Sequence, residues 1–199
     1  MSRPRVVIFS GNTRRPSRSR ALAEALGAEV GRRVSIDLKI YDILDAGPGF
    51  GSALVRNDLP LPAARILDEI ESADALIVGT PVYKGAYTGL FKHLIDFIGP
   101  EHLTGKPVAL TATGGGARHA LVVEHALRPL FGFFASFTIP TAIYGSDTDF
   151  AATDDGTGYV VVDSGIRTRL SSAANELAGL LSKPAAVTEP VLRAARAAK

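Results

Sequence analysis

Short apolar runs alternate with amphipathic stretches along this chain, and the alternation predicts strands that are each followed by a helix. Runs rich in Val, Ile, Leu and Ala predict strands over 5–10, 34–41, 75–80, 107–113 and 137–144. Apolar positions at helical spacing predict helices over 22–30, 63–72, 88–98, 117–134 and 164–181. This order predicts an α/β fold with a doubly wound, five-stranded parallel sheet of order 2-1-3-4-5.

The segments between these elements complete the expected organisation. Residues 42–62, with several Gly and Pro, and residues 145–162 are predicted to be loops. Pro129 lies inside the fourth predicted helix and should kink or break it. We expect one domain over residues 1–182 and a separate C-terminal tail over 183–199.

The loop that follows the first strand is rich in hydroxyl and guanidinium groups and leads into a helix. The N–H groups at a helix N-terminus favour an anion, and Ser and Arg side chains bind phosphate oxygens. The simpler interpretation is that Ser17 only caps the helix and that the arginines form a solvated surface. The density of these groups favours a phosphate monoester site built from Asn12, Arg14, Arg15, Ser17, Arg18 and Ser19.

Two further loops should reach the same edge of the sheet. After the third strand, Pro81, Val82, Tyr83 and Lys84 offer a stiff turn and a flat aromatic ring. Tyr83 suits a planar ligand or the closure of the core equally well. After the fourth strand, Thr113 is followed by three glycines, which indicate close approach of the backbone to a planar ring more than a flexible turn.

Composition excludes several other classes of function. The chain of 199 residues has no Cys, so thiolate catalysis and thiolate metal sites are excluded. The net charge is +2, and the basic clusters lack interleaved aromatics, which disfavours nucleic-acid binding. The four His lack carboxylates at ligand spacing, so no metal site is expected. The chain starts almost directly with a strand and has no long apolar run, which predicts a cytoplasmic protein.

The three loop sequences, taken in order, resemble those of the NAD(P)H-dependent FMN reductases of the flavodoxin-like superfamily. Within that family they are most similar to the reductase components of alkanesulfonate and methanesulfonate monooxygenase systems. The resemblance implies an FMN phosphate site at Asn12, Arg14, Ser17 and Ser19. It places the isoalloxazine ring against Pro81, Val82, Tyr83, Lys84, Thr113, Gly114, Gly115 and Gly116. Hydride passes from NADH or NADPH to the flavin, so no catalytic side chain is expected.

The resemblance also draws attention to His125. Alkanesulfonate-type relatives carry an inserted Tyr in a π-bulge of the fourth helix, at a tetramer interface near the flavin, and His125 stands there in this chain. An interface or core histidine without a role in turnover is an equal alternative. A homodimer or homotetramer is expected, because one sheet face should not cover Phe91, Phe97, Phe131, Phe133 and Phe134.

Three functions fit the sequence. The first is an FMN reductase that supplies a flavin-dependent monooxygenase in sulfur metabolism. The second is an enzyme that retains FMN and reduces quinones or azo dyes. The third is a flavodoxin-like electron carrier, which the basic isoelectric point of about 9.0 disfavours. The sequence does not choose between NADH and NADPH, or name the monooxygenase.

Overall fold

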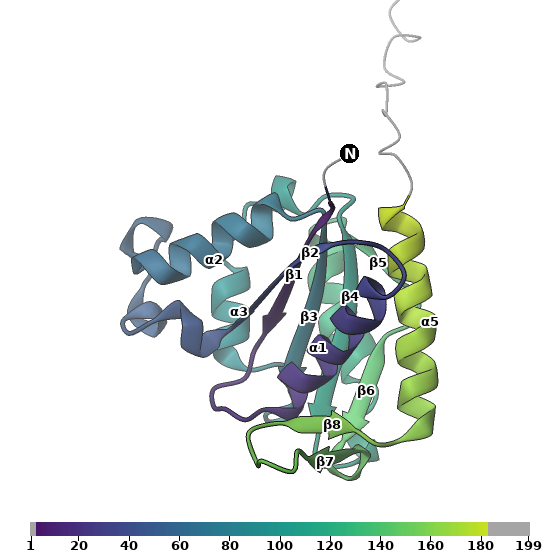
Figure 1. Cartoon of the computed structure of the whole chain (residues 1–199). Helices are drawn as coiled ribbons and strands as arrows, with labels where there is room; N and C mark the ends of the chain where they lie inside the picture. Colours follow the sequence, from purple (N-terminus) through teal and green to yellow (C-terminus); the bar gives the residue numbers. More distant parts are fainter. Residues whose placement is uncertain (1–2, 183–199) are drawn as a thin grey trace, which may run out of the picture.

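The computed structural model describes residues 3–182, so the predicted tail lies outside the described residues. Parallel strands build the central sheet in the order β2–β1–β3–β4, and β5 and β6 both pair with β4 at its far edge (Figure 1). The strands are β1 Arg5–Ser10, β2 Asp37–Asp42, β3 Ala75–Pro81, β4 Pro107–Gly114, β5 Phe137–Thr138 and β6 Ile143–Ser146. The predicted α/β class and strand order are confirmed.

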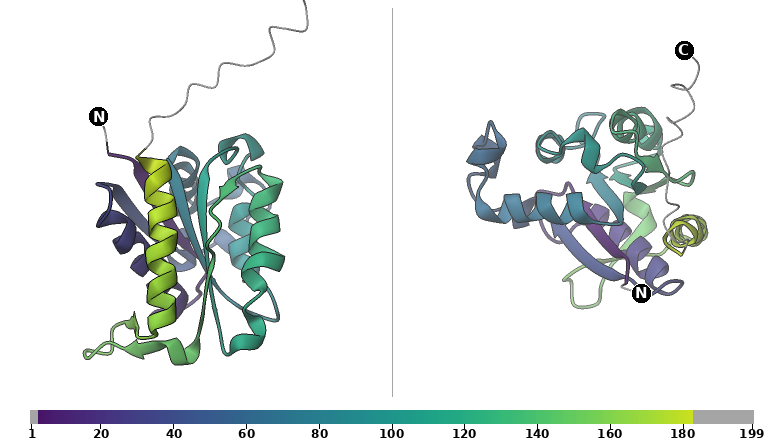
Figure 2. Two further views of the ribbon diagram at one scale, coloured as in Figure 1. Left: turned by 90° about the vertical axis from the view of Figure 1, so that its right-hand side faces the viewer. Right: turned by 90° about the horizontal axis from the view of Figure 1, so that it is seen from above.

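Helices cover both faces of the sheet, as Figure 2 shows. One face packs against α1 (Arg18–Gly31) and α5 (Ser164–Leu181). The opposite face packs against α2 (Leu61–Ser72), α3 (Gly89–Ile95) and α4 (Arg128–Phe133). None of the helices within residues 3–182 combines the length and the hydropathy that crossing a membrane requires.

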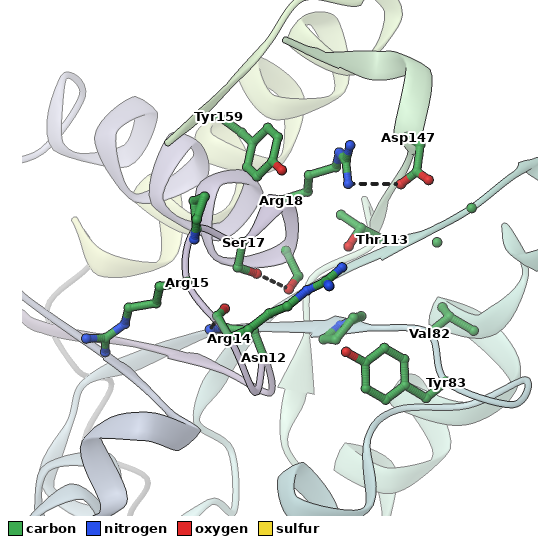
Figure 3. A pocket seen from close by; sticks show the side chains of 15 residues that line it. Asn12, Arg14, Arg15, Ser17, Arg18, Val82, Tyr83, Thr113, Asp147 and Tyr159 are labelled. Carbon is green, nitrogen blue, oxygen red and sulfur yellow. Dashed lines mark hydrogen bonds and ion pairs between the residues drawn. The ribbon is translucent and has the colours of Figure 1, made fainter. Parts of the chain in front are cut away.

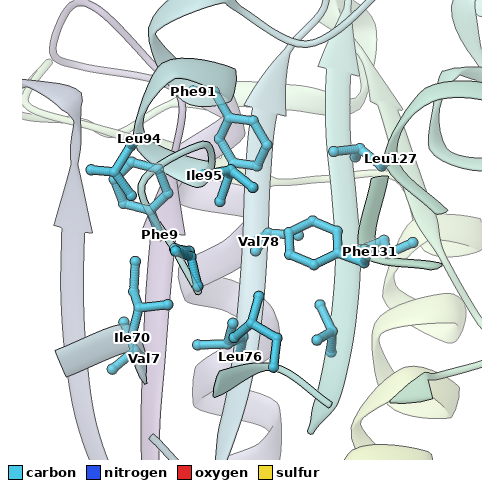
Figure 4. Packing of buried hydrophobic residues seen from close by; sticks show 14 of the residues in the cluster. Val7, Phe9, Ile70, Leu76, Val78, Phe91, Leu94, Ile95, Leu127 and Phe131 are labelled. Atoms are coloured by element: carbon cyan, nitrogen blue, oxygen red, sulfur yellow. The ribbon is translucent and has the colours of Figure 1, made fainter. Parts of the chain in front are cut away.

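The side chains of each central strand divide between two cores. Val7 and Phe9 of β1 point to the α2–α3–α4 side, whereas Val6 and Ile8 point to the α1–α5 side. Figure 4 shows the first of these cores, in which Phe91 stacks on Phe9 with ring centroids 5.7 Å apart. Because successive side chains of a strand point to opposite faces, apolar runs without alternation are what a sheet covered on both sides requires.

The expectation that one sheet face does not cover all five phenylalanines of the α3–α4 side holds for one of them. Phe91, Phe131 and Phe134 are buried within the single chain, and Phe97 is partly buried. Phe133 is the exception, with 72% of its surface exposed. The argument for an oligomer from these five residues therefore fails for four of them, because one sheet face and its helices do cover those side chains.

The fifth strand, predicted over 137–144, is interrupted. Val108 of β4 pairs with Thr138, but Thr111 pairs with Ile143, so the edge segment contains more residues than β4 between these points. Pro140 lies in the gap and has no N–H to donate to the ladder. Side chains compensate: Arg128 Nη1 donates to Ile139 O at 3.0 Å, and Thr141 N donates to a carboxylate oxygen of Glu176 at 2.9 Å.

Both predicted loops contain regular structure. Residues 42–62 form three 3₁₀ turns, Ile43–Ala46, Phe50–Ser52 and Arg56–Asp58, before α2 begins. Residues 145–162 contain the 3₁₀ turn Asp147–Asp149 and an antiparallel hairpin, β7 Phe150–Ala152 with β8 Tyr159–Val161. Each of these elements is only three or four residues long, too short for hydrophobic periodicity to reveal it.

The fourth predicted helix consists of three pieces. These are a 3₁₀ turn over Ala117–His119, a π-helix over Val123–Leu127 and α4 itself. Elsewhere, a separate 3₁₀ turn over Pro100–His102 lies before β4. Pro129 is at the start of α4, directly after the π-helix. The predicted break is confirmed, and it takes the form of a change of helix type, since Pro129 has no N–H for the α-helical hydrogen bond.

Candidate functional site

The carboxyl ends of β1, β3 and β4 open into one pocket of about 480 Å³ (Figure 3). This is where ligands bind in open α/β sheets, and the volume lies in the usual range for a small-molecule site. The pocket brings together twelve of the residues predicted from sequence: Asn12, Arg14, Arg15, Ser17, Arg18, Ser19, Pro81, Val82, Tyr83, Thr113, Gly114 and Gly115. Lys84 and Gly116 do not line it.

Ser17 is the N-cap of α1, as the simpler interpretation of the sequence expected. Its Oγ accepts a hydrogen bond from Arg20 N at 3.3 Å and lies 2.9 Å from Ser19 Oγ. Both serines also line the pocket. The cap therefore places two hydroxyls and the positive end of a helix dipole at the pocket wall, which is an environment that favours an anion.

The three arginines of the first loop have different surroundings. Arg15 also lines the pocket, but its guanidinium donates to Asp42 at 2.7 and 2.8 Å and to Asp45 at 2.7 Å. Arg18 lies 3.4 Å from Asp147. Within residues 3–182, Arg14 has no carboxylate partner, and its side chain lies beside Asn12 and Ser17 in Figure 3. Two carboxylates already neutralise the Arg15 guanidinium, which makes it less available to a phosphate than Arg14.

Asp42, at the end of β2, organises this loop and was missed from the sequence. Its side chain is fully buried and accepts hydrogen bonds from Arg15, from Arg20 Nη1 at 2.7 Å and from Asn12 Nδ2 at 3.0 Å. Burial opposes ionisation of this carboxyl, but the hydrogen bonds from Arg15, Arg20 and Asn12 outweigh it and hold the pKa of Asp42 below its ordinary value. The one sign of it in the sequence is that Asp42, an acidic residue, stands at the end of β2, the strand beside β1.

Asn12 is almost completely buried, with 2% of its surface exposed. Its Nδ2 donates both to Asp42 and to Arg14 O, which uses the two amide protons. Its Oδ1 is buried and has no partner within the described residues. As placed, Asn12 can accept a hydrogen bond but has no proton left to donate to a phosphate oxygen.

The second loop is joined to the third by the hydrogen bond from Val82 N to Thr113 O, at 2.7 Å. Tyr83 lines the pocket with 46% of its surface exposed, so it does not close the core. Lys84 is at the tip of the turn closed by Tyr83 N and Ala86 O, with a φ of 53°. Lys84 itself is not among the residues that line the pocket.

The glycines of the third loop have two different surroundings. A Cβ on Gly114 would lie 2.5 Å from Tyr144 Oη, whereas nothing lies within 4 Å of a Cβ on Gly116. The Tyr144 hydroxyl donates to Gly116 O at 2.7 Å, and burial raises the pKa of Tyr144, which keeps this donor protonated. Gly114 is therefore required by a tyrosine of the protein itself, while the space beside Gly115 is open except for Asp147 at 3.9 Å.

A fourth wall of the pocket comes from the segment after β6, which the sequence interpretation treated as a loop. Asp147 and Tyr159 both line the pocket, and both contact Arg18. The Arg18 guanidinium lies over the Tyr159 ring, 4.6 Å from its centroid (Figure 3). Nothing in the spacing of Asp147 and Tyr159 identifies them, because the 3₁₀ turn that carries Asp147 and the hairpin strand that carries Tyr159 are too short to show a periodic pattern.

His125 lies in the π-helix, where the resemblance placed it, and it is exposed. It does not line the pocket. Its proximity to a flavin remains an expectation about an assembly of several chains. Within residues 3–182, no cluster of three or more His, Asp or Glu side chains could hold a metal ion.

We expect Asp42→Asn to destabilise the fold by about 2 kcal/mol, since charged hydrogen bonds to Arg15 and Arg20 are weakened. Because folding lowers the pKa of Asp42, its stabilisation is fully present above the unfolded-state pKa of about 3.9 and is lost as pH falls through the folded-state pKa. Urea unfolding between neutral and acid pH should therefore show a difference between wild type and variant that shrinks at low pH.

Asp37→Asn is the matched control, because Asp37 is exposed at the opposite end of the same strand. A difference between Asp42→Asn and wild type that stayed constant into acid would contradict this role of the Asp42 charge.

Gly114→Ala should destabilise the protein by about 1–3 kcal/mol, because the new Cβ overlaps the Tyr144 hydroxyl. Adding Tyr144→Phe removes the overlapping oxygen and leaves contacts of 3.4 Å, so the double variant should recover most of the loss relative to Tyr144→Phe alone. Gly116→Ala, which meets nothing within 4 Å, serves as the control. Thermal unfolding measures all four proteins, and equal losses for Gly114→Ala with and without Tyr144 would refute the steric explanation.

Comparison with known proteins agrees with this geometry. The sequence profile of the NADPH-dependent FMN reductase family matches residues 4–151. An FMN reductase (NADPH) of Pseudomonas aeruginosa is 45% identical over 88% of this chain and 91% of its own length. The NADH-dependent FMN reductase SfnF of Pseudomonas fluorescens is 44% identical over 90% and 94%. The apo form of the NADH:FMN oxidoreductase EMOB superposes with a TM-score of 0.78 at 28% identity, covering 92% of both chains. The chain belongs to the NADPH-dependent FMN reductase family.

Proposed function

We propose that this protein is an NAD(P)H-dependent FMN reductase that binds FMN in the pocket at the ends of β1, β3 and β4. The observation that carries the assignment is the first loop, where Ser17, Ser19 and the unpaired Arg14 meet the N-terminus of α1 at one wall. Two hydroxyls, free helix N–H groups and one guanidinium match the acceptor oxygens and the negative charge of a phosphate monoester. Arg18 lies at the same wall, held by Asp147.

The other end of the pocket suits the flavin ring. Val82, Tyr83, Thr113, Gly114 and Gly115 line this part, and the open space beside Gly115 lets the backbone approach a flat ligand. When bound, FMN supplies the ring that accepts hydride from NADH or NADPH, while the protein binds and orients it. Asn12 Oδ1 is suited to a ligand hydroxyl, such as those of the ribityl chain, rather than to the phosphate.

Delivery of reduced FMN to a flavin-dependent monooxygenase of the sulfonate type is the finer part of the proposal. It rests on the order and content of the three loops, which resemble the reductase components of such systems. Self-association belongs to the same proposal. It is supported by exposed apolar side chains around α4, since Leu121, Phe133 and Phe137 are 61%, 72% and 51% exposed.

The decisive experiment is oxidation of NADH and of NADPH by the purified chain with and without added FMN. Oxidation should depend on added FMN, and reduced FMN should be trapped in solution by an acceptor that cannot enter the protein. A protein that keeps its flavin through purification and reduces quinones or azo dyes much faster than free FMN belongs to the flavin-retaining class. A protein that oxidises neither nucleotide is not a reductase, and a flavodoxin-like carrier would behave in that way.

Arg14→Ala should weaken the binding of FMN more than the binding of riboflavin, because only FMN carries the phosphate. Loss of a charged hydrogen bond corresponds to about 1.5–3 kcal/mol, or roughly tenfold to a hundredfold in the Kd for FMN. Arg65→Ala is the matched control, since it removes the same charge from an exposed side chain of α2 that does not line the pocket. Flavin fluorescence titrations measure both ligands. Equal losses for FMN and riboflavin in Arg14→Ala would contradict the phosphate assignment.

A further inference from the structure

Arg18 contacts two side chains of the segment that follows β6. Its Nη1 lies 3.4 Å from Asp147 Oδ1, and its guanidinium carbon lies 4.6 Å from the centre of the Tyr159 ring. Its Nε is buried and has no partner within the described residues. Arg18 is also the first residue of α1, directly after the Ser17 cap. One cation therefore connects the proposed phosphate site to the fourth wall of the pocket.

Among the described residues that line the pocket, Asp147 is the one carboxylate. It lines the same cavity as Arg14, Ser17 and Ser19. The pair with Arg18 is open to solvent, because 33% of the Arg18 and 56% of the Asp147 side chain is exposed. At 3.4 Å the contact is an ion pair longer than a good charge-assisted hydrogen bond, so the guanidinium is held loosely enough to exchange partners.

The backbone around Asp147 keeps the carboxylate where it is. Asp147 begins a 3₁₀ turn that is held to Ser146 by Asp149, whose Oδ2 accepts from Ser146 N at 2.6 Å and from Ser146 Oγ at 2.7 Å. Strand β6 carries Ser146 as its last residue. The backbone that carries Asp147 is therefore anchored at the end of the sheet, whereas the longer Arg18 side chain has more rotatable bonds with which to change partners.

We propose that Asp147 competes with the phosphate of bound flavin for Arg18, and that it thereby weakens the hold on FMN and speeds its release. The inference rests on the proposed function. A phosphate at the start of α1 and the Asp147 carboxylate both attract the same guanidinium, and they repel each other. Each time FMN leaves, Asp147 regains the guanidinium, so release does not leave Arg18 without a carboxylate partner. A reductase that hands its flavin to another protein needs such release.

The test is Asp147→Asn in the full-length chain, with FMN and riboflavin as ligands. The variant should bind FMN about two- to fivefold more tightly, the range of an exposed ion pair. Stopped-flow displacement should show FMN leaving more slowly by a similar factor, because affinity differences of this kind appear mainly in the dissociation rate. The Kd for riboflavin should stay unchanged. Asp154→Asn, at an exposed carboxylate of the hairpin turn, removes the same charge outside the pocket lining and should leave both ligands unaffected.

A change in FMN affinity in the opposite direction would overturn the inference. Weaker or unchanged FMN binding in Asp147→Asn would mean that Asp147 orients Arg18 for the phosphate or plays no part. In an Arg18→Met background, Asp147→Asn should have a smaller effect, since no guanidinium remains to be exchanged; an undiminished effect would also refute the competition. If wild type showed no preference for FMN over riboflavin, the proposed phosphate site itself would fail, independently of Asp147.

Discussion

A single buried carboxylate holds together the part of the molecule on which the pocket depends. Asp42 ends β2, yet its hydrogen-bond partners come from the first loop and from α1. It satisfies an amide and two guanidinium groups at once, so the charge that burial would otherwise disfavour is fully compensated. The loop after β1 has little apolar surface to pack, and this network replaces packing as the source of its shape.

The same network sorts the arginines of the loop. Arg15 and Arg20 are neutralised by acidic side chains on the β2 side, and Arg18 is turned toward the hairpin. Arg14 is left facing the pocket. Of the three nearby arginines in the sequence, one therefore presents to a ligand a guanidinium without a carboxylate partner in residues 3–182, together with a helix terminus. Local charge density in the sequence overstates the charge that the site offers.

Much of the fold was predictable, because long apolar runs and amphipathic helices are set by local periodicity. The strand order and the meeting of three loops at one edge followed from that alternation and from the handedness of crossovers. The break at Pro140 was missed because Ile139, Ala142 and Ile143 continue the apolar pattern on both sides of it. Asp42, Asp147 and Tyr159 were missed because their importance comes from partners far away in the chain, and no spacing records such contacts. Gly114 was identified as a special position, but the reason is Tyr144, which lies a strand away.

The gap between β5 and β6 ties together helices that the sheet keeps apart. Arg128 of α4 grips its start, while Glu176 and Arg169 of α5 hold Thr141 and Ala142 at its end. The segment between β5 and β6 thus links the helices of the two cores at the edge of the sheet. Arg128 follows the π-helix directly, and β6 leads from this segment to Asp147. The π-helix and the pocket residue Asp147 are therefore connected along the edge of the sheet by an unbroken series of hydrogen bonds and neighbouring residues.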